Sequence, residues 1–300
     1  MDVEYPSKRR DVNFNSSAIT AMKSRYTCRM YQGKTIEPGL RASLIQSLDD
    51  NKLGPLGTKA RFEIIAASEG DVSSLKGLGT YGLIKGANGF IVGATESGPK
   101  SLEDFGYLME CAILRATELG LGTCWLGGVF TKSNFAKRIQ LTDGEIMPAI
   151  VVVGYREEGS KERDKVRKGA GADHRLPREA LFFEGDFNKP IKDEASGPYR
   201  EVLDLVRWAP SASNKQPWRI VKTETGWHFC LARSKHYGKG SLLFTLLRIP
   251  DLQRVDMGIA MCHFELSAQE LGLKGSWVVE DPALPLPDKT EYVVTWRPKV

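Results

Sequence analysis

The sequence predicts an α+β protein, with a central mixed or antiparallel sheet wrapped by helices. Helix-like and strand-like segments alternate in both halves of the 300 residues. The strand-like segments 218–221 and 227–232 are separated by a short turn containing Glu-Thr-Gly, which favours antiparallel pairing over the long crossovers of a doubly wound sheet. An internal repeat, the third observation, indicates that the two halves share one architecture.

The repeat is a segment of 22 residues that begins at Asp104 and occurs again at Asp256, 152 positions later. The copies are identical at ten positions, namely Asp104/Asp256, Gly106/Gly258, Met109/Met261, Leu114/Leu266, Ala116/Ala268, Glu118/Glu270, Leu119/Leu271, Gly120/Gly272, Leu121/Leu273 and Trp125/Trp277. This similarity predicts an internal pseudo-two-fold repeat in which one chain imitates a dimer. A functional pocket is then expected at the seam between the halves.

The first half contains the predicted elements in the following order. Ser16 or Ser17 is expected to cap a short helix that ends near Lys23, and the apolar spacing of 40–48 indicates a second helix. Short β-branched segments at 62–67 and 90–94 predict buried strands. The repeated segment predicts a helix over about 102–119, followed by a glycine-rich loop at 120–128 and a third strand at 149–154.

The second half follows a polar stretch, 157–197, which is too long for a tight turn and is expected to be a crossing loop. The later elements are a helix at 200–208, a loop at 209–217, strands at 218–221 and 227–232, the second repeated helix, and a final strand at 292–296. We therefore divide the chain into an N-terminal arm (1–14), a first half (15–156), the crossing loop (157–197) and a second half (198–300). The halves are expected to form one intertwined unit.

Composition excludes several classes of function. The 42 basic residues nearly match the 37 acidic ones, so the net charge of +5 gives no basis for nucleic-acid binding. No run of 18 apolar residues occurs and the first residues lack the apolar stretch of a signal peptide, so we expect a cytoplasmic protein without membrane spans. Five cysteines without a CxxC pair predict buried free thiols, and four histidines without ligand spacing predict no metal site.

Three separated motifs contain candidate binding residues. Arg25 and Arg29 are four residues apart at a helix edge and can converge on one phosphate, with Thr27 as a further donor; ordinary surface charge is the alternative interpretation. The segment 209–218 (APSASNKQPW) places Ser and Asn in a turn that can hydrogen-bond a polar ligand, or that contains only ordinary turn residues. The segment 120–128 (GLGTCWLGG) has four glycines that let the backbone approach a bound molecule.

Other nucleotide sites are not indicated. The glycine-rich segment fits neither the Rossmann pattern GxGxxG nor the phosphate-binding pattern GxxxxGK[ST]. The local excess of basic residues at 161–178 is either a solvated loop or an anion pocket.

Together, the Arg25/Thr27/Arg29 element, the APSASNxQPW turn and the GLGTCWLGG segment resemble the FMN-dependent nitroreductase family. Their order is similar to its long, single-chain "putative TM nitroreductase" branch, and the resemblance covers roughly residues 15–280. It implies a nitroreductase-like fold, in which the family's two subunits intertwine around FMN. This chain has one arginine element and one Pro-Ser turn, which implies one complete site per chain and a monomer that acts as a pseudo-dimer.

The resemblance also implies which residues bind FMN. Arg25, Tyr26, Thr27, Arg29 and Arg175 would hold the phosphate and ribityl chain, although this chain has Asp173 where the family often has Lys. The ring-binding residues would be Pro210, Ser211, Ala212, Ser213, Asn214 and Gln216 on one side, Thr123, Cys124, Trp125, Leu126, Gly127 and Gly128 along the reactive edge, and Thr80 and Tyr81 near the pyrimidine end. Lys85 and Lys215 are candidates for positive charge near the ring, or are solvated surface lysines.

The implied function is an FMN-dependent NAD(P)H oxidoreductase that works by ping-pong hydride transfer through flavin N5 to a nitroaromatic, a quinone or a similar small-molecule acceptor. The flavin performs the chemistry, so no catalytic side chain is expected. Two alternatives stay open: a flavin carrier or sensor without turnover, and a specialised family chemistry such as flavin breakdown or reductive dehalogenation.

Overall fold

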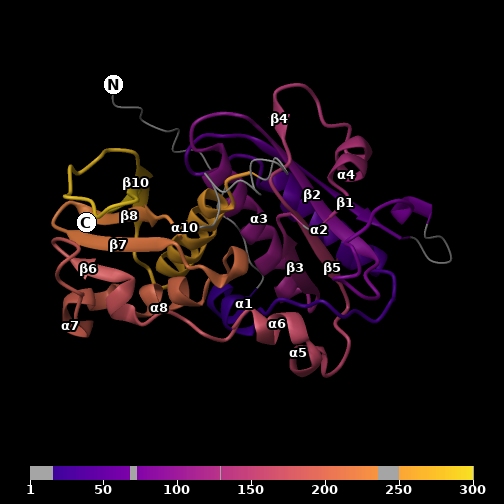
Figure 1. Cartoon of the computed structure of the whole chain (residues 1–300), viewed down its shortest axis with the longest axis horizontal. Helices are drawn as coiled ribbons and strands as arrows, with labels where there is room; N and C mark the ends of the chain where they lie inside the picture. Colours follow the sequence, from indigo (N-terminus) through magenta and orange to yellow (C-terminus); the bar gives the residue numbers. More distant parts are fainter. Residues whose placement is uncertain (1–15, 68–72, 129, 236–249, 300) are drawn as a thin grey trace.

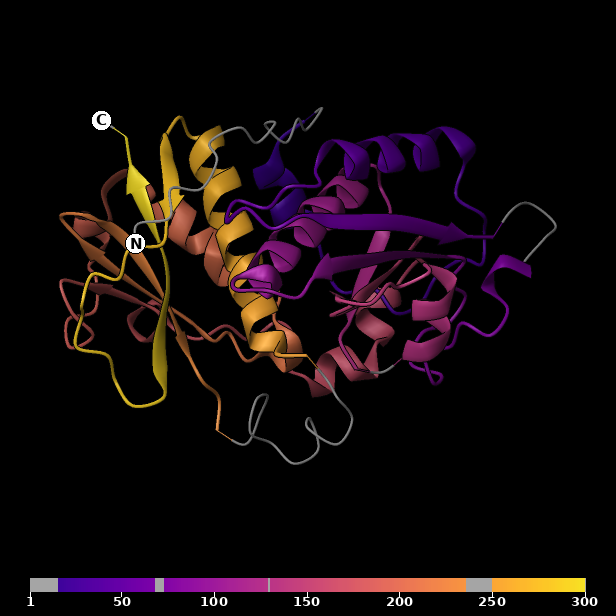
Figure 2. The ribbon, with the colours of Figure 1, turned by 90° about the horizontal axis from the view of Figure 1, so that it is seen from above.

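The fold consists of two sheets, one from each half of the chain, on opposite sides of a central pair of helices (Figures 1 and 2). The computed structural model describes residues 16–67, 73–128, 130–235 and 250–299. The expected N-terminal arm, 1–14, lies outside these residues. The predicted α+β class is correct, and the structure adds that each half forms a sheet of its own.

The first half contains the predicted elements and several more. They are α1 (Ala18–Ser24), α2 (Pro38–Asp50), β1 (Ala60–Ala66), the 3-10 turn η1 (Ser73–Leu75), β2 (Gly89–Glu96), α3 (Ser101–Glu118), β3 (Gly122–Leu126), α4 (Lys132–Arg138), β4 (Glu145–Ile146) and β5 (Ile150–Gly154). Ser17 caps α1, since its side chain accepts the Thr20 N–H at 3.0 Å. The expectation of a glycine-rich loop is wrong over Gly122–Leu126, where Thr, Cys and Trp favour the β conformation and pair with β5.

Several short elements lie between the two halves, mostly within the stretch 157–197. They are α5 (Ser160–Arg163), α6 (Lys165–Gly169), η2 (Arg178–Ala180), β6 (Phe182–Glu184), α7 (Asp193–Ser196) and η3 (Gly197–Tyr199). The stretch 157–197, expected to be a crossing loop, is therefore partly regular. Next come α8 (Arg200–Trp208), η4 (Ala212–Asn214), β7 (Trp218–Thr223), β8 (Gly226–Ala232), α10 (Leu252–Glu270), β9 (Gly275–Val278) and β10 (Thr290–Pro298).

The two sheets have the same strand connectivity. The first runs β1-β2-β5-β3, with β4 also paired to β2, and the second runs β6-β7-β8-β10-β9. Apart from the added strands β4 and β6, both sheets are built in the same chain order. An antiparallel strand pair comes first (β1 and β2, or β7 and β8), followed by a long helix and an edge strand (β3 or β9). The last strand (β5 or β10) then inserts between the edge strand and the first pair. The parallel pairing of β6 with β7 makes the second sheet mixed.

The central helices α3 and α10 cross at two glycines that occupy the same position in the repeat. A Cβ atom on Gly258 would lie 1.9 Å from the carbonyl oxygen of Glu103, and one on Gly106 would lie 2.2 Å from that of Val255. These contacts are reciprocal, because Glu103 and Val255 are themselves 152 positions apart. Only residues without a side chain permit this approach, which explains why both copies keep glycine.

Each repeated helix ends in the same way. Gly120 and Gly272 adopt φ angles of 80° and 75°. The N–H groups of Leu121 and Leu273 donate back to carbonyl oxygens five residues earlier, at 2.9 and 2.8 Å. This is the Schellman arrangement, in which a left-handed glycine ends the helix and satisfies its last carbonyl groups.

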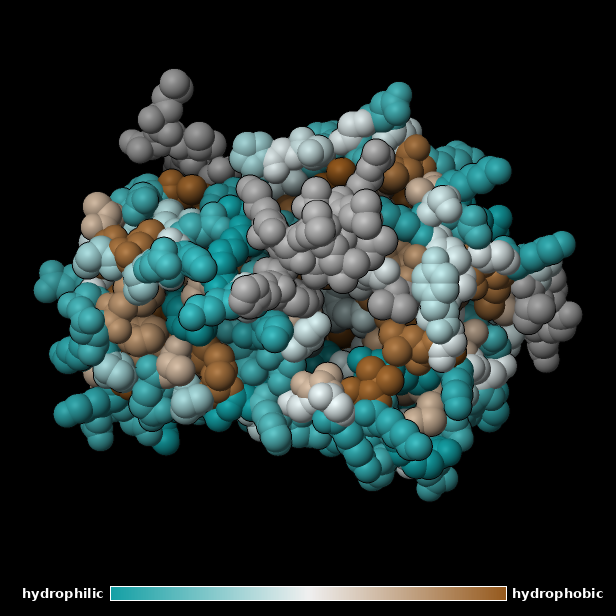
Figure 3. Space-filling model, viewed as in Figure 1, coloured by the Kyte–Doolittle hydropathy of each residue, from teal (hydrophilic) through white to brown (hydrophobic). Residues whose placement is uncertain are grey.

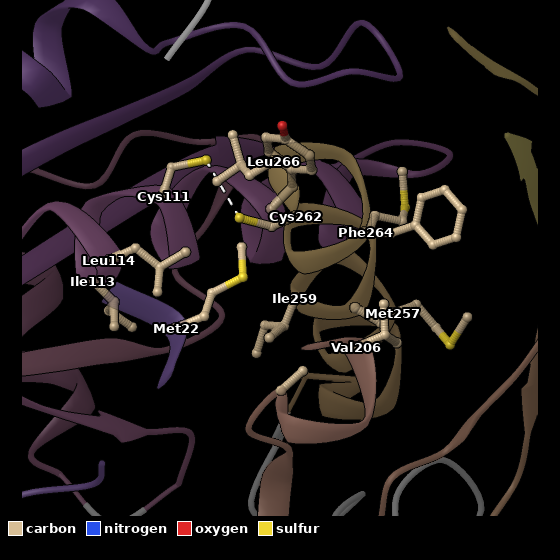
Figure 4. Packing of buried hydrophobic residues seen from close by; sticks show 14 of the residues in the cluster. Met22, Cys111, Ile113, Leu114, Val206, Met257, Ile259, Cys262, Phe264 and Leu266 are labelled. Carbon is tan, nitrogen blue, oxygen red and sulfur yellow. Dashed lines mark hydrogen bonds between the residues drawn. The ribbon is translucent and has the colours of Figure 1, made fainter. Parts of the chain in front are cut away.

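Both halves contribute to one large apolar core. Figure 4 shows Met22 of α1 between Cys111 and Leu114 of α3 and Ile259 of α10. All five cysteines are buried free thiols, as predicted. On the face shown in Figure 3, hydrophobic residues are scattered among hydrophilic ones, and no helix in the described ranges has the length and apolar character required to cross a membrane.

Candidate functional site

A cavity of about 460 Å³ lies where the end of α1, the α6 region and the end of α8 meet. Nine of the nineteen predicted site residues line it: Arg25, Tyr26, Thr27, Arg29, Arg175, Pro210, Ser211, Ser213 and Asn214. The arginine motif and the Pro-Ser turn are almost 190 positions apart in the sequence, yet the fold brings them to one cavity. Its size is within the range of small-molecule and cofactor sites.

The repeat positions the arginine motif through α1. Glu118 and Glu270, which are equivalent in the repeat, both bind the start of this helix: Glu118 accepts the Ser16 N–H, and Glu270 accepts the Ile19 N–H at 3.0 Å. The chain leaves the helix at Arg25, which has an extended backbone, and then runs beside β3, where the Cys28 N–H donates to the Thr123 carbonyl at 2.8 Å. The motif is thus held at both ends.

The Pro-Ser turn has an unusual backbone. Ser213, Asn214 and Gln216 adopt positive φ angles of 50°, 53° and 47°, a region that is costly for residues with side chains. Side-chain hydrogen bonds fix this geometry: Asn214 donates to the carbonyl oxygens of Gly171 and His174 at 2.7 and 2.9 Å. Strained backbone held in this way is typical of functional sites.

A buried aspartate anchors the turn from behind. Asp256, at the start of the second repeat copy, accepts the Ala212 N–H at 2.9 Å, and burial raises its pKa well above the usual range. Asp104 is its equivalent in the first half and accepts the N–H groups of Leu56 and Thr58 at 2.8 and 2.7 Å. The turn at 54–58 is therefore the first-half counterpart of the Pro-Ser turn, but it lacks the Ser and Asn side chains.

The cavity is strongly basic. Seven cationic side chains line it, namely Lys23, Arg25, Arg29, Lys161, Arg167, Arg175 and Arg207, against one acidic side chain, Asp173. Four of the cations have acidic partners: Arg29 donates to Asp164 at 2.9 Å and Arg167 pairs with Asp173. Lys23 pairs with Glu201 at 2.9 Å, and Arg25 lies 3.8 Å from Glu110. Asp173, which stands where a lysine was expected, therefore holds a different arginine at the cavity wall.

Burial and neighbouring positive charges lower the pKa values of two arginines. Burial, together with the positive charges of Arg25 and Arg167, lowers the pKa of Arg175 to about 10. Burial also lowers the pKa of Arg25, against the opposing effect of Glu110. A bound anion would counteract both effects, because it adds negative charge to a wall on which cations outnumber acidic groups.

Some hydrogen-bond donors at this cavity also lack an acceptor among the described residues. The buried Nε atoms of Arg25, Arg29 and Arg175 have no hydrogen-bond partner among the described residues. Unpaired buried donors are unfavourable, and a phosphate group matches guanidinium donors in charge and geometry. Aromatic surface lies next to them, in Tyr26 and in the half-exposed Trp208. Anion donors beside flat apolar rings fit a ligand with a phosphate and an aromatic ring system.

Ten predicted site residues do not line the cavity. Six of them lie in or directly after β3: Thr123, Cys124, Trp125, Leu126, Gly127 and Gly128. The Thr123 carbonyl accepts a hydrogen bond from the arginine motif, and the Trp125 indole donates to Glu110 at 2.8 Å. Ala212 and Gln216 support the turn from behind, with Gln216 accepting the Leu176 N–H at 2.9 Å. Thr80 and the exposed Tyr81 lie on a separate surface turn, and Lys85 and Lys215 are exposed.

Several lining residues were not predicted. Arg167 and Lys161 belong to the basic stretch 161–178, whose alternative interpretation as an anion pocket agrees with their position. Their side chains also lie over the ring of Tyr26, 5.9 and 5.7 Å from its centre. Arg207 and Trp208 were missed because they are the last residues of an amphipathic helix and match no motif.

Known proteins resemble this chain in family and in fold. The model of the family described as "Putative TM nitroreductase" matches residues 17–268. The solved structure of a "putative nitroreductase" from Thermotoga maritima has a TM-score of 0.59 at 17% identity, covering 97% of this chain and 98% of that chain, which shows a shared fold.

Shorter chains match about half of this one. A nitroreductase family protein from Clostridium difficile is 21% identical and covers 55% of this chain and 94% of its own, with a TM-score of 0.39. A nitroreductase with bound FMN from Desulfitobacterium hafniense is 20% identical and covers 48% of this chain and 91% of its own, with a TM-score of 0.37. The comparison with curated proteins gave no match.

Proposed function

The chain belongs to the nitroreductase family whose model spans residues 17–268, and from this premise we propose that it is an FMN-dependent NAD(P)H oxidoreductase. The observation that carries the proposal is the cavity, where unpaired arginine donors lie beside aromatic surface and a strained polar turn. When bound, FMN supplies the redox chemistry, taking a hydride from NAD(P)H and passing it to a nitroaromatic, a quinone or a similar acceptor.

In this proposal the arginine motif holds the cofactor's phosphate. The Nε donors of Arg25, Arg29 and Arg175 have no hydrogen-bond partner within the part of the chain that the structure describes, and Thr27 adds a hydroxyl at the same wall. Arg175 is itself fixed, since it donates to the carbonyl oxygens of Ala172 and Trp208 at 2.7 and 3.1 Å. Such preorganised donors bind an anion without first having to be ordered.

The Pro-Ser turn then faces the cofactor's ring system. Pro210, Ser211 and Ser213 present small side chains that let a flat ring approach, and Asn214 provides polar atoms at its edge. The Asn214 oxygen already accepts a bond from Arg175 at 3.1 Å, so the phosphate-binding and ring-binding walls are joined. The chain's task is to bind and orient the cofactor while leaving one ring face open to the second substrate.

We further propose one site per chain and a monomer that acts as a pseudo-dimer. The identical strand connectivity and the reciprocal glycine contacts support an internal repeat. The counterpart turn at 54–58 has no Ser or Asn side chains, and the cavity combines the arginine motif of one half with the turn of the other. This is the arrangement expected when one of two symmetric sites is lost.

The first experiment tests cofactor binding and turnover. The purified protein is mixed with excess FMN, gel-filtered, and scanned for the flavin absorption band, with one flavin per chain expected. Anaerobic NADH or NADPH should then bleach this band rapidly. A protein that holds flavin but is not bleached by either would be a carrier or sensor, and a protein that holds no flavin would refute the proposal.

A matched pair of arginine variants tests the site. Arg29→Ala should weaken FMN binding by roughly ten- to a hundredfold, because a charge-assisted contact contributes about 1.5–3 kcal/mol. Arg163→Ala is the control, since Arg163 is exposed and lies outside the cavity. Equal affinities of the two variants would contradict the assigned phosphate site.

A further inference from the structure

Behind the cavity, a buried carboxyl group contacts Arg25. Glu110 of α3 is fully buried, and its Oε1 lies 3.8 Å from Arg25 Nε. Its Oε2 accepts the Trp125 indole N–H at 2.8 Å. If Glu110 simply carried a negative charge, it would cancel the positive charge of Arg25 and weaken the arginine as an anion-binding group.

The second neighbour of Glu110 is a buried histidine whose two ring nitrogens both face acceptors. His263 Nδ1 lies 3.0 Å from the Leu205 carbonyl oxygen, and Nε2 lies 3.1 Å from Glu110 Oε1. A carbonyl oxygen cannot donate, so the first contact requires a proton on Nδ1. The second contact then requires another proton, carried by either Nε2 or Oε1.

Counting protons gives the net charge of this pair. With the proton on Nε2 the pair is a cation and an anion, and with the proton on Oε1 it is two neutral groups. The sum is zero in both cases. Among the described residues, the other ionisable groups around Arg25 and the pair are Arg167 and Arg175, the buried thiol of Cys124, and the neighbouring thiols of Cys111 and Cys262. Arg25 therefore keeps its positive charge.

The repeat offers an internal comparison. Its offset relates Glu110 to Cys262 and His263 to Cys111. These two thiols contact each other at 3.5 Å, as Figure 4 shows. The same pair of positions thus holds two thiols on one side and an ionisable pair on the side that contacts Arg25.

From these contacts we infer that His263 is a positioning residue for the anion site: by holding a proton with Glu110, it keeps the charge of Arg25 available to the cofactor's phosphate. This inference rests on the proposed function for the identity of the ligand. It assigns a role to two buried residues that do not line the cavity.

A double-mutant cycle tests the inference. FMN dissociation constants are measured by flavin fluorescence for the unmodified protein, His263→Gln, Glu110→Gln and the double variant. His263→Gln leaves an uncompensated carboxylate next to Arg25, so we expect FMN binding about tenfold weaker, which is about 1.4 kcal/mol. Adding Glu110→Gln removes that carboxylate, so the double variant should recover most of the lost affinity.

A role in packing alone predicts a different result: the two losses need not be additive, because the residues are in contact, but a second core substitution would not restore the FMN affinity lost through the first. An unchanged affinity of His263→Gln, or a double variant at least as weak as His263→Gln, would overturn the inference. Failure of the unmodified protein to bind FMN would instead refute the proposed function.

A second measurement needs neither a variant nor FMN. In the isotopically labelled protein at pH 7, the nitrogen shifts of His263 and the carboxyl carbon shift of Glu110 report where protons are bound. One proton on Nδ1 and one more on either Nε2 or the carboxyl group is the expected result. A neutral imidazole beside an ionised Glu110 would overturn the inference. This measurement therefore tests the inference even if the His263 variant fails to fold.

Discussion

Replacing Gly258 by alanine should destabilise the whole protein through the helix crossing. The new Cβ would lie 1.9 Å from the Glu103 carbonyl oxygen and 2.7 Å from the Tyr107 nitrogen, both backbone atoms of α3. Since ordinary contacts begin near 3.4 Å, α10 would have to move by about 1.5 Å. Overpacking of this kind costs about 1–3 kcal/mol, here at the upper end because the obstacle is backbone, and alanine's helix propensity returns about 1 kcal/mol.

The expected net loss is therefore about 2 kcal/mol in the free energy of unfolding, or roughly 3 °C in Tm for a chain of 300 residues. Urea unfolding followed by circular dichroism measures it. Gly39→Ala is the control, because Gly39 is also helical but a Cβ there would meet no atom within 4 Å. Its stability should be unchanged or raised by up to about 1 kcal/mol.

If Gly258→Ala unfolds at the same urea concentration as Gly39→Ala, the close crossing is not present and the reasoning fails. The reciprocal variant Gly106→Ala should behave like Gly258→Ala, since its Cβ would lie 2.2 Å from the Val255 carbonyl oxygen. A loss in only one of the two variants would contradict the pseudo-two-fold character of the crossing.

Three further predictions concern a buried acid, the phosphate site and a helix cap. Burial raises the pKa of Asp104 to about 7, so the native state retains a proton that the unfolded chain releases near pH 4, and stability falls as the pH rises from about 4 to 7. Asp104→Asn has no titrating group at this position, so its stability does not fall in the same way. Measured by urea unfolding, the free energy of unfolding of the variant should rise relative to that of the unmodified protein by up to about 4 kcal/mol between pH 4 and pH 7. A difference that does not change with pH would refute the prediction. Arg175→Lys should weaken FMN binding several-fold, because lysine cannot bond Asn214 and the Trp208 carbonyl together; fluorescence titration checks this, and unchanged affinity would count against the site. Ser17→Ala should lower the free energy of unfolding by about 1 kcal/mol through loss of the α1 cap, measurable by urea unfolding, and an equally stable variant would contradict the cap.

Local sequence signals predicted the main elements well. The helix expected at 200–208 is α8, Arg200–Trp208, because its apolar spacing and the following Ala-Pro define both ends. The three first-half strands at 62–67, 90–94 and 149–154 were found within a few residues of their true bounds. The strand Gly122–Leu126 was missed, since its flanking glycines dominate the local pattern while its pairing with β5 is a long-range contact.

The candidate site was only partly predictable for the same reason. Arg25, Arg175 and Asn214 belong to separate motifs, and only the folded chain shows that Arg175 bonds Asn214 at 3.1 Å. Charge alone could not decide whether the basic stretch 161–178 is a solvated loop or an anion pocket. The sequence does not show that Arg167 and Arg175 face the cavity, or that Asp173 pairs with Arg167. Glu110 and His263 gave no signal, since each looks like an ordinary helical residue.

The positions at which the two copies of the repeat are identical have packing roles, unlike several of the positions at which the copies differ. Gly106 and Gly258 must both stay small, because each accommodates the other helix's carbonyl group, so neither copy can change alone. Trp125 donates to Glu110 at 2.8 Å and Trp277 donates to Glu265 at 2.7 Å, so both indoles keep a buried carboxyl partner although these two glutamates are not equivalent in the repeat. Such scaffold contacts are needed in both halves to close one core.

A ligand site carries no such mutual requirement. In the proposed one-site arrangement, a single cavity binds the cofactor, so the counterpart of the Pro-Ser turn can lose its polar side chains and keep only its buried anchor, Asp104. The positions of Glu110 and His263 likewise hold the thiols of Cys262 and Cys111 in the other copy. Packing therefore preserves the symmetry of the scaffold, while binding chemistry needs to be retained only on the side where Arg25 meets the cavity.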